Sequence, residues 1–478
     1  MGFMSAESIP PEITQLLKKH GQQHLLAFWE ELDGSARRRL LAQLEGLELD
    51  WVDEWVSEIV TGGGPEQPRG DIEPAGAYPP IPGNERQRRL YGQAMELGRE
   101  LISAGKVAAF VVAGGQGTRL GFAGPKGNFP ISPIRNKTLF QLFAEQIAAA
   151  GKKYGCRCPW YVMTSPLNYS ETVEIFRRNG YYGLGQQDVF IFEQGTLPNF
   201  SFDGKILMAD KSTISCSPDG HGGSLKALYR SGAIADMRKR GVELISYFQV
   251  DNPLVKIFDP LFLGLHRLEG ASMSSKALPK REPGEKVGVF CVADGRIKVI
   301  EYSDLPEDLA TKRRADGSLV FGLGSIAIHA IEVEFVERLN QQGFALPLHR
   351  AVKKIRHIDD RGNVVEPAEP NGVKLESFVF DALPLAEKSV ILETTRQEEF
   401  APVKNADGQD SPATCRAMMV CRAAEWLESA GVFVPRRADN TPDCIIEMAA
   451  SFAVEKADVA ARAGCVPVIK PGDRVYLE

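Results

Sequence analysis

A short apolar run followed by a glycine-rich loop constrains the fold of this chain more than any other feature. The run covers residues 107–113 and reads Val-Ala-Ala-Phe-Val-Val-Ala. Such a run is typical of a strand that is buried on both faces of a parallel sheet. Five glycines then fall within residues 114–124. Because glycine permits positive φ and close backbone approach, a loop of this kind can surround a nucleotide with its N–H groups.

Arg119 and Lys126 add two positive charges to this loop. A guanidinium and an ammonium beside backbone donors suit a polyphosphate ligand. The glycine spacing matches neither the dinucleotide-binding pattern G-x-G-x-x-G nor the Walker A pattern G-x-x-x-x-G-K-[ST]. The loop therefore predicts nucleotide binding of a kind that neither of these two patterns describes.

Alternating strand and helix patterns indicate the fold class. Beyond the first strand, we expect strands at 160–164, 189–192 and 243–250, and helices at 139–150, 171–179 and 224–240. This order favours an α/β fold with a central, doubly wound, mostly parallel sheet. After about residue 272 the chain becomes richer in strand patterns, and Asp294-Gly295 predicts a hairpin between 287–292 and 297–301.

The chain is expected to comprise three consecutive segments, which suits a length of 478 residues. Residues 1–100 are predicted to form an N-terminal helical region that ends in a Gly/Pro-rich connector beginning near residue 62. Residues 101–395 are predicted to form the central domain. Residues 396–478 are predicted to form a small C-terminal α+β domain.

Charge and hydropathy exclude several classes of protein. The 56 basic and 62 acidic residues leave a net charge of −6, which argues against a nucleic-acid partner held by a basic face. No window reaches 18 uninterrupted apolar residues, so we expect no transmembrane helix and no membrane partner. The N-terminal residues lack the pattern of a secretory signal, which favours a cytoplasmic location. The eight cysteines contain no C-x-x-C pair and give no zinc-site pattern.

The loop at 114–127, written G-G-Q-G-T-R-L-G-x-x-x-P-K-G, resembles the nucleotide loop of eukaryotic-type UDP-sugar pyrophosphorylases. Within that family it is most similar to the UDP-N-acetylhexosamine pyrophosphorylases. Further motifs agree in the same order along most of the chain: 192–198 (Phe-Glu-Gln-Gly-Thr-Leu-Pro), 217–223 (Ser-Pro-Asp-Gly-His-Gly-Gly), 249–256 (Gln-Val-Asp-Asn-Pro-Leu-Val-Lys), 370–381 (Pro-Asn-Gly-Val-Lys-Leu-Glu-Ser-Phe-Val-Phe-Asp) and 399–407 (Glu-Phe-Ala-Pro-Val-Lys-Asn-Ala-Asp).

The resemblance implies a Rossmann-like sheet of the glycosyltransferase A (GT-A) type and the roles of several residues at a uridine nucleotide. The backbone at Ala113, Gly114 and Gly115 would hold the uracil and the ribose of UTP. Gln194 and Gly220 would read the edge of the uracil. A glutamine suits this task because its amide offers one donor and one acceptor to an imide.

The resemblance also implies roles at the phosphates. Arg119 and Lys126 would bind the β- and γ-phosphates of UTP, and Lys404 would neutralise the phosphate of a sugar 1-phosphate or the α-phosphate. Asp251 would contact the ribose or bind Mg²⁺, with Mn²⁺ as a substitute. The implied activity is uridylyl transfer from UTP to a sugar 1-phosphate by a monomer or weak homo-oligomer. A catalytically silent UDP-sugar-binding protein is disfavoured because all four charged residues are present.

The choice of sugar stays open at this stage. The resemblance assigns Gly288 and Glu301 to the sugar hydroxyls and favours an N-acetylhexosamine. Two positions depart from the pattern of the acetylhexosamine enzymes, because His221 stands where they usually have Asn and Ser325 stands where they tend to have Asn. A pocket built to bond one group rejects analogues that lack it. Glucose 1-phosphate or galactose 1-phosphate therefore remains the alternative substrate.

Overall fold

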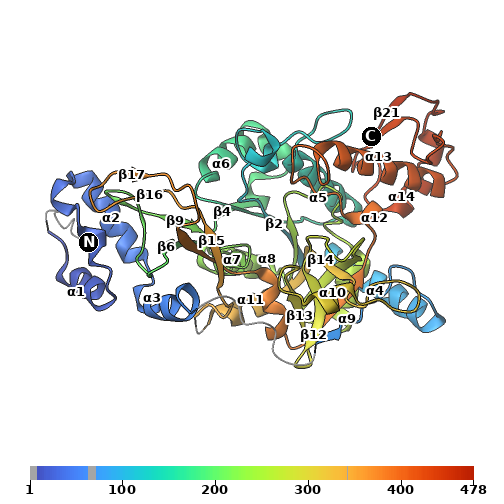
Figure 1. Cartoon of the computed structure of the whole chain (residues 1–478). Helices are drawn as coiled ribbons and strands as arrows, with labels where there is room; N and C mark the ends of the chain where they lie inside the picture. Colours follow the sequence, from blue (N-terminus) through green and yellow to red (C-terminus); the bar gives the residue numbers. More distant parts are fainter. Residues whose placement is uncertain (1–7, 63–71, 342) are drawn as a thin grey trace. The chain divides into compact units, whose positions relative to one another are not determined.

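The computed structural model describes residues 8–62, 72–341 and 343–478. Parts of the Gly/Pro-rich connector, at 63–71, lie outside the described residues. The chain forms two compact units (Figure 1). The larger unit comprises Gly70–Gln194, Ser224–Ala345 and Phe380–Glu478, and the smaller unit comprises Met1–Arg69, Gly195–Gly223 and Leu346–Val379.

A ten-stranded sheet forms the centre of the larger unit, and seven of its strands follow the order β1-β12-β14-β10-β2-β3-β4. Strand β11 pairs with β14 and β19, and β13 pairs with β12. The strands are β1 (Glu73–Pro74), β2 (Val107–Val112), β3 (Trp160–Thr164), β4 (Val189–Glu193), β10 (Leu244–Gln249), β11 (Met273–Pro279), β12 (Val289–Ala293), β13 (Arg296–Ile300), β14 (Leu323–Glu332) and β19 (Ser389–Glu393).

The predicted α/β fold with a large central sheet is confirmed. Strands β10, β2, β3 and β4 run parallel to one another, and every residue of β2 is buried. β14 joins this parallel block in the antiparallel sense, alongside β10. The predicted hairpin is also present, because β12 and β13 pair antiparallel across Asp294 (φ 52°) and Gly295 (φ 70°). Two successive positive φ values match the twist of a tight hairpin.

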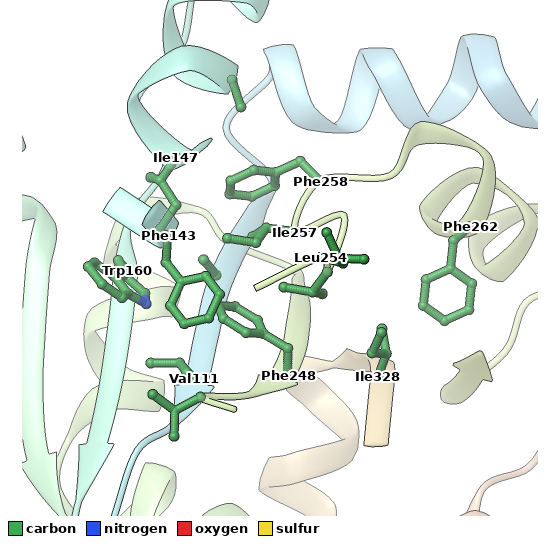
Figure 2. Packing of buried hydrophobic residues seen from close by; sticks show 14 of the residues in the cluster. Val111, Phe143, Ile147, Trp160, Phe248, Leu254, Ile257, Phe258, Phe262 and Ile328 are labelled. Carbon is green, nitrogen blue, oxygen red and sulfur yellow. The ribbon is translucent and has the colours of Figure 1, made fainter. Parts of the chain in front are cut away.

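Helices cover the sheet and bury a large apolar core. They include α4 (Glu85–Ser103), α5 (Leu139–Tyr154), α6 (Tyr169–Arg178), α7 (Gly223–Arg230), α8 (Ala233–Arg240), α9 (Pro260–Leu268), α10 (Glu307–Thr311), α11 (Val333–Asn340) and α12 (Arg396–Glu399). Figure 2 shows Phe143 and Ile147 of α5 beside Trp160 of β3 and Phe248 of β10. The rings of Phe143 and Phe248 meet edge to face with centroids 5.0 Å apart. Aromatic pairs in this geometry hold a helix firmly on a sheet.

The C-terminal segment has a small core of its own within the larger unit. It consists of α13 (Pro412–Ser429), the parallel strands β20 (Ile445–Met448) and β21 (Arg474–Leu477), and α14 (Lys456–Ala460). The Glu447 carboxylate accepts hydrogen bonds from the backbone N–H groups of Ile134 (2.6 Å) and Arg135 (2.8 Å). This contact fixes the segment that follows the glycine-rich loop.

The smaller unit joins the N-terminal helices to segments from the middle of the chain. Its elements are α1 (Pro11–Lys19), α2 (Gly34–Gly46), α3 (Val52–Glu54), β5 (Thr196–Pro198), β6 (Phe200–Ser201), β7 (Met208–Asp210), β8 (Thr213–Ile214), β9 (Cys216–Pro218), β15 (His349–Lys353), β16 (His357–Ile358), β17 (Val364–Val365) and β18 (Gly372–Glu376). The Gln22 amide bonds to Gly204 O (2.9 Å) and to Ile206 N (2.9 Å). This division differs from the three consecutive segments expected from the sequence, which stay a prediction.

Among the described residues, every helix is too short or too polar to span a lipid bilayer.

A close crossing of α4 and α9 depends on two glycines. An ideal Cβ at Gly264 would lie 1.8 Å from the carbonyl oxygen of Ala94, and one at Gly98 would lie 1.9 Å from that of Pro260. Real Cβ atoms cannot approach backbone this closely, so the two helix backbones meet only because both positions lack side chains.

We expect Gly264→Ala to lower the free energy of unfolding by about 1–3 kcal/mol, because the added methyl overpacks the crossing. Gly92→Ala is the matched control on α4, since a Cβ at Gly92 meets nothing within 4 Å. That change should raise the free energy of unfolding by about 0.5–1 kcal/mol through helix propensity. Urea titration followed by circular dichroism measures both. Equal stability of the two variants would contradict the assigned crossing.

Candidate functional site

The carboxyl ends of four neighbouring parallel strands carry the candidate site. Ala113 follows β2, Ser165 follows β3, Gln194 follows β4, and Asp251 follows the end of β10 by two residues. The parallel register pairs Gln249 with Val112 and Met163 with Phe192, so these four ends lie at one edge of the sheet. Open α/β sheets bind ligands at this edge.

The glycine-rich loop folds back on itself through backbone hydrogen bonds. Gly117 N donates to Gly124 O (2.9 Å), and Lys126 N donates to Gly115 O (3.0 Å). Gly121 (φ 68°) and Gly124 (φ 112°) adopt left-handed conformations that favour glycine. The predicted loop therefore has a defined shape of its own.

The structure brings Gly114 and Gln194 together, as the resemblance implied. An ideal Cβ at Gly114 would lie 2.4 Å from the Gln194 Oε1 atom. The Gln194 side chain can occupy this position only because residue 114 is glycine. The backbone N–H of Gln194 donates to Thr164 O at 2.8 Å, which ties Gln194 to the end of β3.

Arg119 and Lys126 both lie on this loop, in short 3₁₀ turns at Thr118–Leu120 and Lys126–Asn128. Lys126 Cε lies 3.9 Å from the ideal Cβ position of Gly115, so its side chain runs along the loop. Within the described part of the chain, neither cationic group makes an ion pair or a side-chain hydrogen bond. Cations without protein partners are available to an anionic ligand.

Asp251 and Lys404 meet through the backbone that precedes Lys404. Val403 N donates to Asp251 O (2.8 Å), and Lys404 N donates to Asp410 O (2.7 Å). The Lys404 ammonium lies 5.7 Å from the ring centroid of Phe400. Burial raises the pKa of the Asp410 carboxyl; the Lys404 charge opposes this shift and the Asp251 charge adds to it. Asp410 is thus a further acidic group near both residues, and its position in a polar turn gave no sequence signal.

The residues around Asp251 fit a magnesium ion that is held mainly by substrate. Across 8–62, 72–341 and 343–478, no cluster of three or more His, Cys, Asp or Glu side chains is placed to bind a metal. Mg²⁺ commonly uses one or two carboxylates, with water and phosphate oxygens completing its shell. The Asp251 carboxylate is partly exposed and can serve as such a ligand.

The three residues that the resemblance assigned to the sugar lie together. Gly288 lies at the start of β12, Ser325 at the start of β14 and Glu301 at the end of β13. Ser325 N donates to Gly288 O at 2.8 Å. An ideal Cβ at Gly288 would lie 3.6 Å from Glu301 Oε1 and 2.6 Å from Val299 Cγ1. The absence of a side chain at Gly288 leaves the Glu301 carboxylate beside its backbone.

Gly220 and His221 belong to the smaller unit. Gly220 has φ 85°, and a Cβ there would lie 2.3 Å from Ser377 O, so both conformation and space require glycine. His221 Nδ1 accepts a hydrogen bond from Val379 N (3.0 Å), and its ring stacks on Phe378 with centroids 5.3 Å apart. Because Nδ1 is an acceptor, a neutral His221 ring carries its proton on Nε2.

Asn168 is a residue near this edge that the sequence reasoning missed. Its Nδ2 group donates to Ala113 O (3.2 Å) and to Gly115 O (3.4 Å). Its Oδ1 atom accepts from Ser165 N (2.8 Å) and from the Ser165 hydroxyl (3.0 Å). The buried amide therefore pins the first residues of the glycine-rich loop to the end of β3. Its place before a predicted helix indicated only a helix cap.

Comparison with known proteins places the chain in a family. The sequence profile of the UTP–glucose-1-phosphate uridylyltransferase family matches residues 85–475, and the chain belongs to this family. It is 39% identical to the UDP-N-acetylhexosamine pyrophosphorylase-like protein 1 of Homo sapiens, over 88% of this chain and 86% of that protein. It is 36% identical to the UDP-N-acetylglucosamine pyrophosphorylase of Saccharomyces cerevisiae, over 88% of this chain and 91% of that protein.

Solved structures agree with this assignment. The crystal structure of the uridine diphosphate N-acetylglucosamine pyrophosphorylase from Trypanosoma brucei in complex with an inhibitor superposes with a TM-score of 0.80 at 26% identity. That match covers 100% of this chain and 99% of the other. A UDP-glucose pyrophosphorylase from Leishmania major gives a TM-score of 0.59 at 15% identity, over 95% and 87%, and shows the shared fold alone.

We expect Asn168→Ala to weaken the binding of UTP about tenfold, or ~1.4 kcal/mol, because the loop loses its anchor to β3. Asn179→Ala is the control: Asn179 follows α6 directly, and its exposed amide bonds only to Ile175 O. That variant should bind UTP as the unaltered protein does. Isothermal titration calorimetry measures both. Unchanged affinity in a folded Asn168→Ala variant would contradict the role of this amide.

Proposed function

We propose that this chain transfers a uridylyl group from UTP to an N-acetylhexosamine 1-phosphate and releases pyrophosphate. The observation that carries this proposal is the edge of the sheet, where a closed glycine loop adjoins Asp251 and the segment of Lys404. The two cations of this loop have no ion-pair partner among the described residues. The names of the relatives support the same reaction class. The family to which the chain belongs is likewise a family of uridylyltransferases.

The reaction follows from the charges of its substrates. A phosphate oxygen of the sugar 1-phosphate attacks the α-phosphorus of UTP, and a new P–O bond forms in line with the bond to the β-phosphate. That second bond breaks, and pyrophosphate leaves with the electron pair. The attacking monoester is already anionic, so the step needs no general base. Catalysis then rests on positioning and on charge neutralisation.

The residues at the edge of the sheet supply these two contributions. Ala113, Gly114 and Gly115 hold the uridine through backbone groups, and Gln194 reads the uracil edge. Gly220 is also assigned to the uracil, as the family resemblance implies.

The phosphates are assigned to the three cations. Arg119 and Lys126 neutralise the β- and γ-phosphates and so stabilise the leaving pyrophosphate. Lys404 neutralises charge at the α-phosphate and the sugar phosphate. Such electrostatic contacts gain strength where water is excluded.

Asp251 would hold the catalytic Mg²⁺, with Mn²⁺ as a substitute. When bound, such a metal would offset the negative charge of the phosphates.

We infer an N-acetylhexosamine as the sugar. The relatives with 34–39% identity are named for UDP-N-acetylhexosamine or UDP-N-acetylglucosamine. His221 stands where the acetylhexosamine enzymes usually have an Asn, and both side chains contain a hydrogen-bond donor. Ser325, Gly288 and Glu301 are assigned to the same sugar. Glucose 1-phosphate or galactose 1-phosphate is the second candidate, because His221 resembles the residue of the UDP-glucose enzymes.

Two wider expectations accompany this function. The parallel block β10-β2-β3-β4 supports a Rossmann-like sheet of the GT-A type. A monomeric or weakly oligomeric protein in the cytoplasm suits an enzyme whose substrates are small, charged metabolites.

We expect Arg119→Ala and Lys126→Ala each to lower kcat/KM by about 100-fold or more, because each removes a charge that stabilises the leaving pyrophosphate. Lys152→Ala is the control, since Lys152 is an exposed lysine of α5 remote in sequence from the loop. A coupled assay for pyrophosphate release measures all three. Near-normal rates in both loop variants would refute their assigned roles.

We expect a preference of about tenfold or more in kcat/KM for N-acetylglucosamine or N-acetylgalactosamine 1-phosphate over glucose and galactose 1-phosphates. The measurement is pyrophosphate release with UTP, Mg²⁺ and each of the four sugar phosphates. His221→Asn should keep the preference and His221→Ala should weaken it, because only the first retains a donor. A preference for glucose or galactose would overturn the sugar assignment and leave uridylyl transfer intact.

A further inference from the structure

The side chain of Asn252 bonds to both polar groups of a backbone segment far away in the sequence. Its Nδ2 group donates to Glu399 O (2.7 Å), and its Oδ1 atom accepts from Ala401 N (3.0 Å). Two residues further on, Val403 N donates to the carbonyl oxygen of Asp251. Three hydrogen bonds thus join Asp251 and Asn252, which follow β10, to the segment that leads into Lys404. Asn252 is 3% exposed, so water does not compete for these bonds.

The segment is also fixed from its other side, through the buried Glu399 carboxylate. This carboxylate accepts from Lys276 Nζ (2.5 Å), from the Thr394 hydroxyl (3.0 Å) and from Lys256 N (3.2 Å). The Lys276 ammonium is fully buried and also lies 2.6 Å from Asp259 Oδ2. Asp259 in turn caps the N-terminus of α9.

The charges in this cluster balance one another. Burial alone would lower the pKa of the Lys276 ammonium. The carboxylates of Asp259 and Glu399 outweigh burial and hold this pKa above its ordinary value. Burial likewise acts against ionised Asp259, whereas Lys276 and Lys256 keep the pKa of that carboxyl below its ordinary value. Separating such buried partners leaves an uncompensated charge, so the cluster resists displacement.

We propose that Asn252 is a positioning residue, which holds the segment 399–404 in register with Asp251 and so places the Lys404 ammonium for transfer. The proposal rests on the function proposed above. Asn252 touches neither the reacting atoms nor Lys404 itself, and it acts through the backbone that carries Lys404. The Glu399–Lys276–Asp259 cluster fixes the first residue of the segment 399–404, and Asn252 fixes the residues that follow it.

A double-mutant cycle tests the proposal with the full chain. The four proteins are the unaltered chain, Asn252→Ala, Lys404→Ala and the double variant. We expect Asn252→Ala to lower kcat at least tenfold while the KM for UTP changes less than threefold, because the uridine loop keeps its own anchors. In the Lys404→Ala background, the same change should lower kcat less than threefold. If the fold loss of kcat in the double variant equals the product of the losses in the two single variants, the proposal is overturned. A near-normal kcat in folded Asn252→Ala would overturn it as well.

Asn371→Ala is the matched control for loss of a half-buried amide that bridges backbone groups. Asn371 bridges backbone in the same way, since its Nδ2 donates to Ile355 O (3.0 Å) and its Oδ1 accepts from Ile355 N (2.7 Å). It lies in the smaller unit, outside the contacts of Lys404. Its loss should lower the melting temperature without coupling to Lys404→Ala. Coupling of equal size in both cycles would assign the Asn252 effect to general stability and overturn the proposal.

Hydrogen exchange separates this proposal from the proposed function. Asn252→Ala should raise exchange at least fivefold in peptides covering 400–405 and leave peptides covering 113–118 unchanged, whether or not the chain has transferase activity. Should Asn252→Ala not fold, Asn252→Asp keeps the acceptor for Ala401 N, removes the donor to Glu399 O and is measured in its place. Unaltered exchange at 400–405 overturns the positioning role. Absence of transfer by the unaltered chain overturns the proposed function instead.

Discussion

The parallel hydrogen-bond register of β10, β2, β3 and β4 is the constraint on which the candidate site depends. Each strand places a different kind of group at one edge of the sheet. The Asp251 carboxylate follows β10, the glycine-rich loop follows β2, Ser165 of the loop anchor follows β3, and the Gln194 amide follows β4. Residues separated by more than 130 positions, from Ala113 to Asp251, become neighbours only through this register. A slip of one residue in a ladder would invert the facing of every side chain in that strand. The apolar residues of these short strands and their buried packing partners keep the register fixed.

Charged residues near this edge of the sheet are of two kinds: buried ions that are paired with opposite charges, and the cations of the glycine loop. Several buried ions of the scaffold are paired with opposite charges, as in the group of Lys276, Asp259 and Glu399 and in the pair of Arg396 with Glu285. The cations of the glycine loop have no such partners within the part of the chain that the structure describes. This contrast gives the site its chemistry. A protein that neutralised Arg119 or Lys126 internally would first have to break that pair before it could bind phosphate, at the cost of desolvated charge.

The sequence allowed much of this arrangement to be predicted. The apolar strand at 107–113, its alternation with helices and the hairpin at Asp294-Gly295 follow from local patterns, and the structure confirms them. The family resemblance assigned Gly114 and Gln194 to the same nucleotide, and the structure places the two residues side by side, while their roles toward the nucleotide stay predictions. Asn168 and Asn252 could not be found in this way, because their roles arise from partners between 53 and 149 residues away and a lone polar residue after a strand indicates only a turn or cap. Asp410 was missed because its proximity to Asp251, 159 residues earlier in the chain, is a property of the fold.

The same physical reason explains the unexpected division of the chain. Helical periodicity identifies the N-terminal helices but says nothing about which strands they cover. Their partners are residues 195–223, through contacts such as that of Gln22 with Gly204 and Ile206.

The bonds from Glu447 to Ile134 and Arg135 have a consequence for the order in which a nascent chain can mature. The glycine loop leaves the ribosome early, but the segment that follows it is held by Glu447 and by Arg416, whose guanidinium donates to Pro130 O and Ile131 O. These partners are synthesised 285–313 residues later. Since domains tend to fold as units during synthesis, this one cannot complete the support of its loop until Glu447 has been synthesised. A truncated translation product would therefore carry the loop without the contacts that brace it.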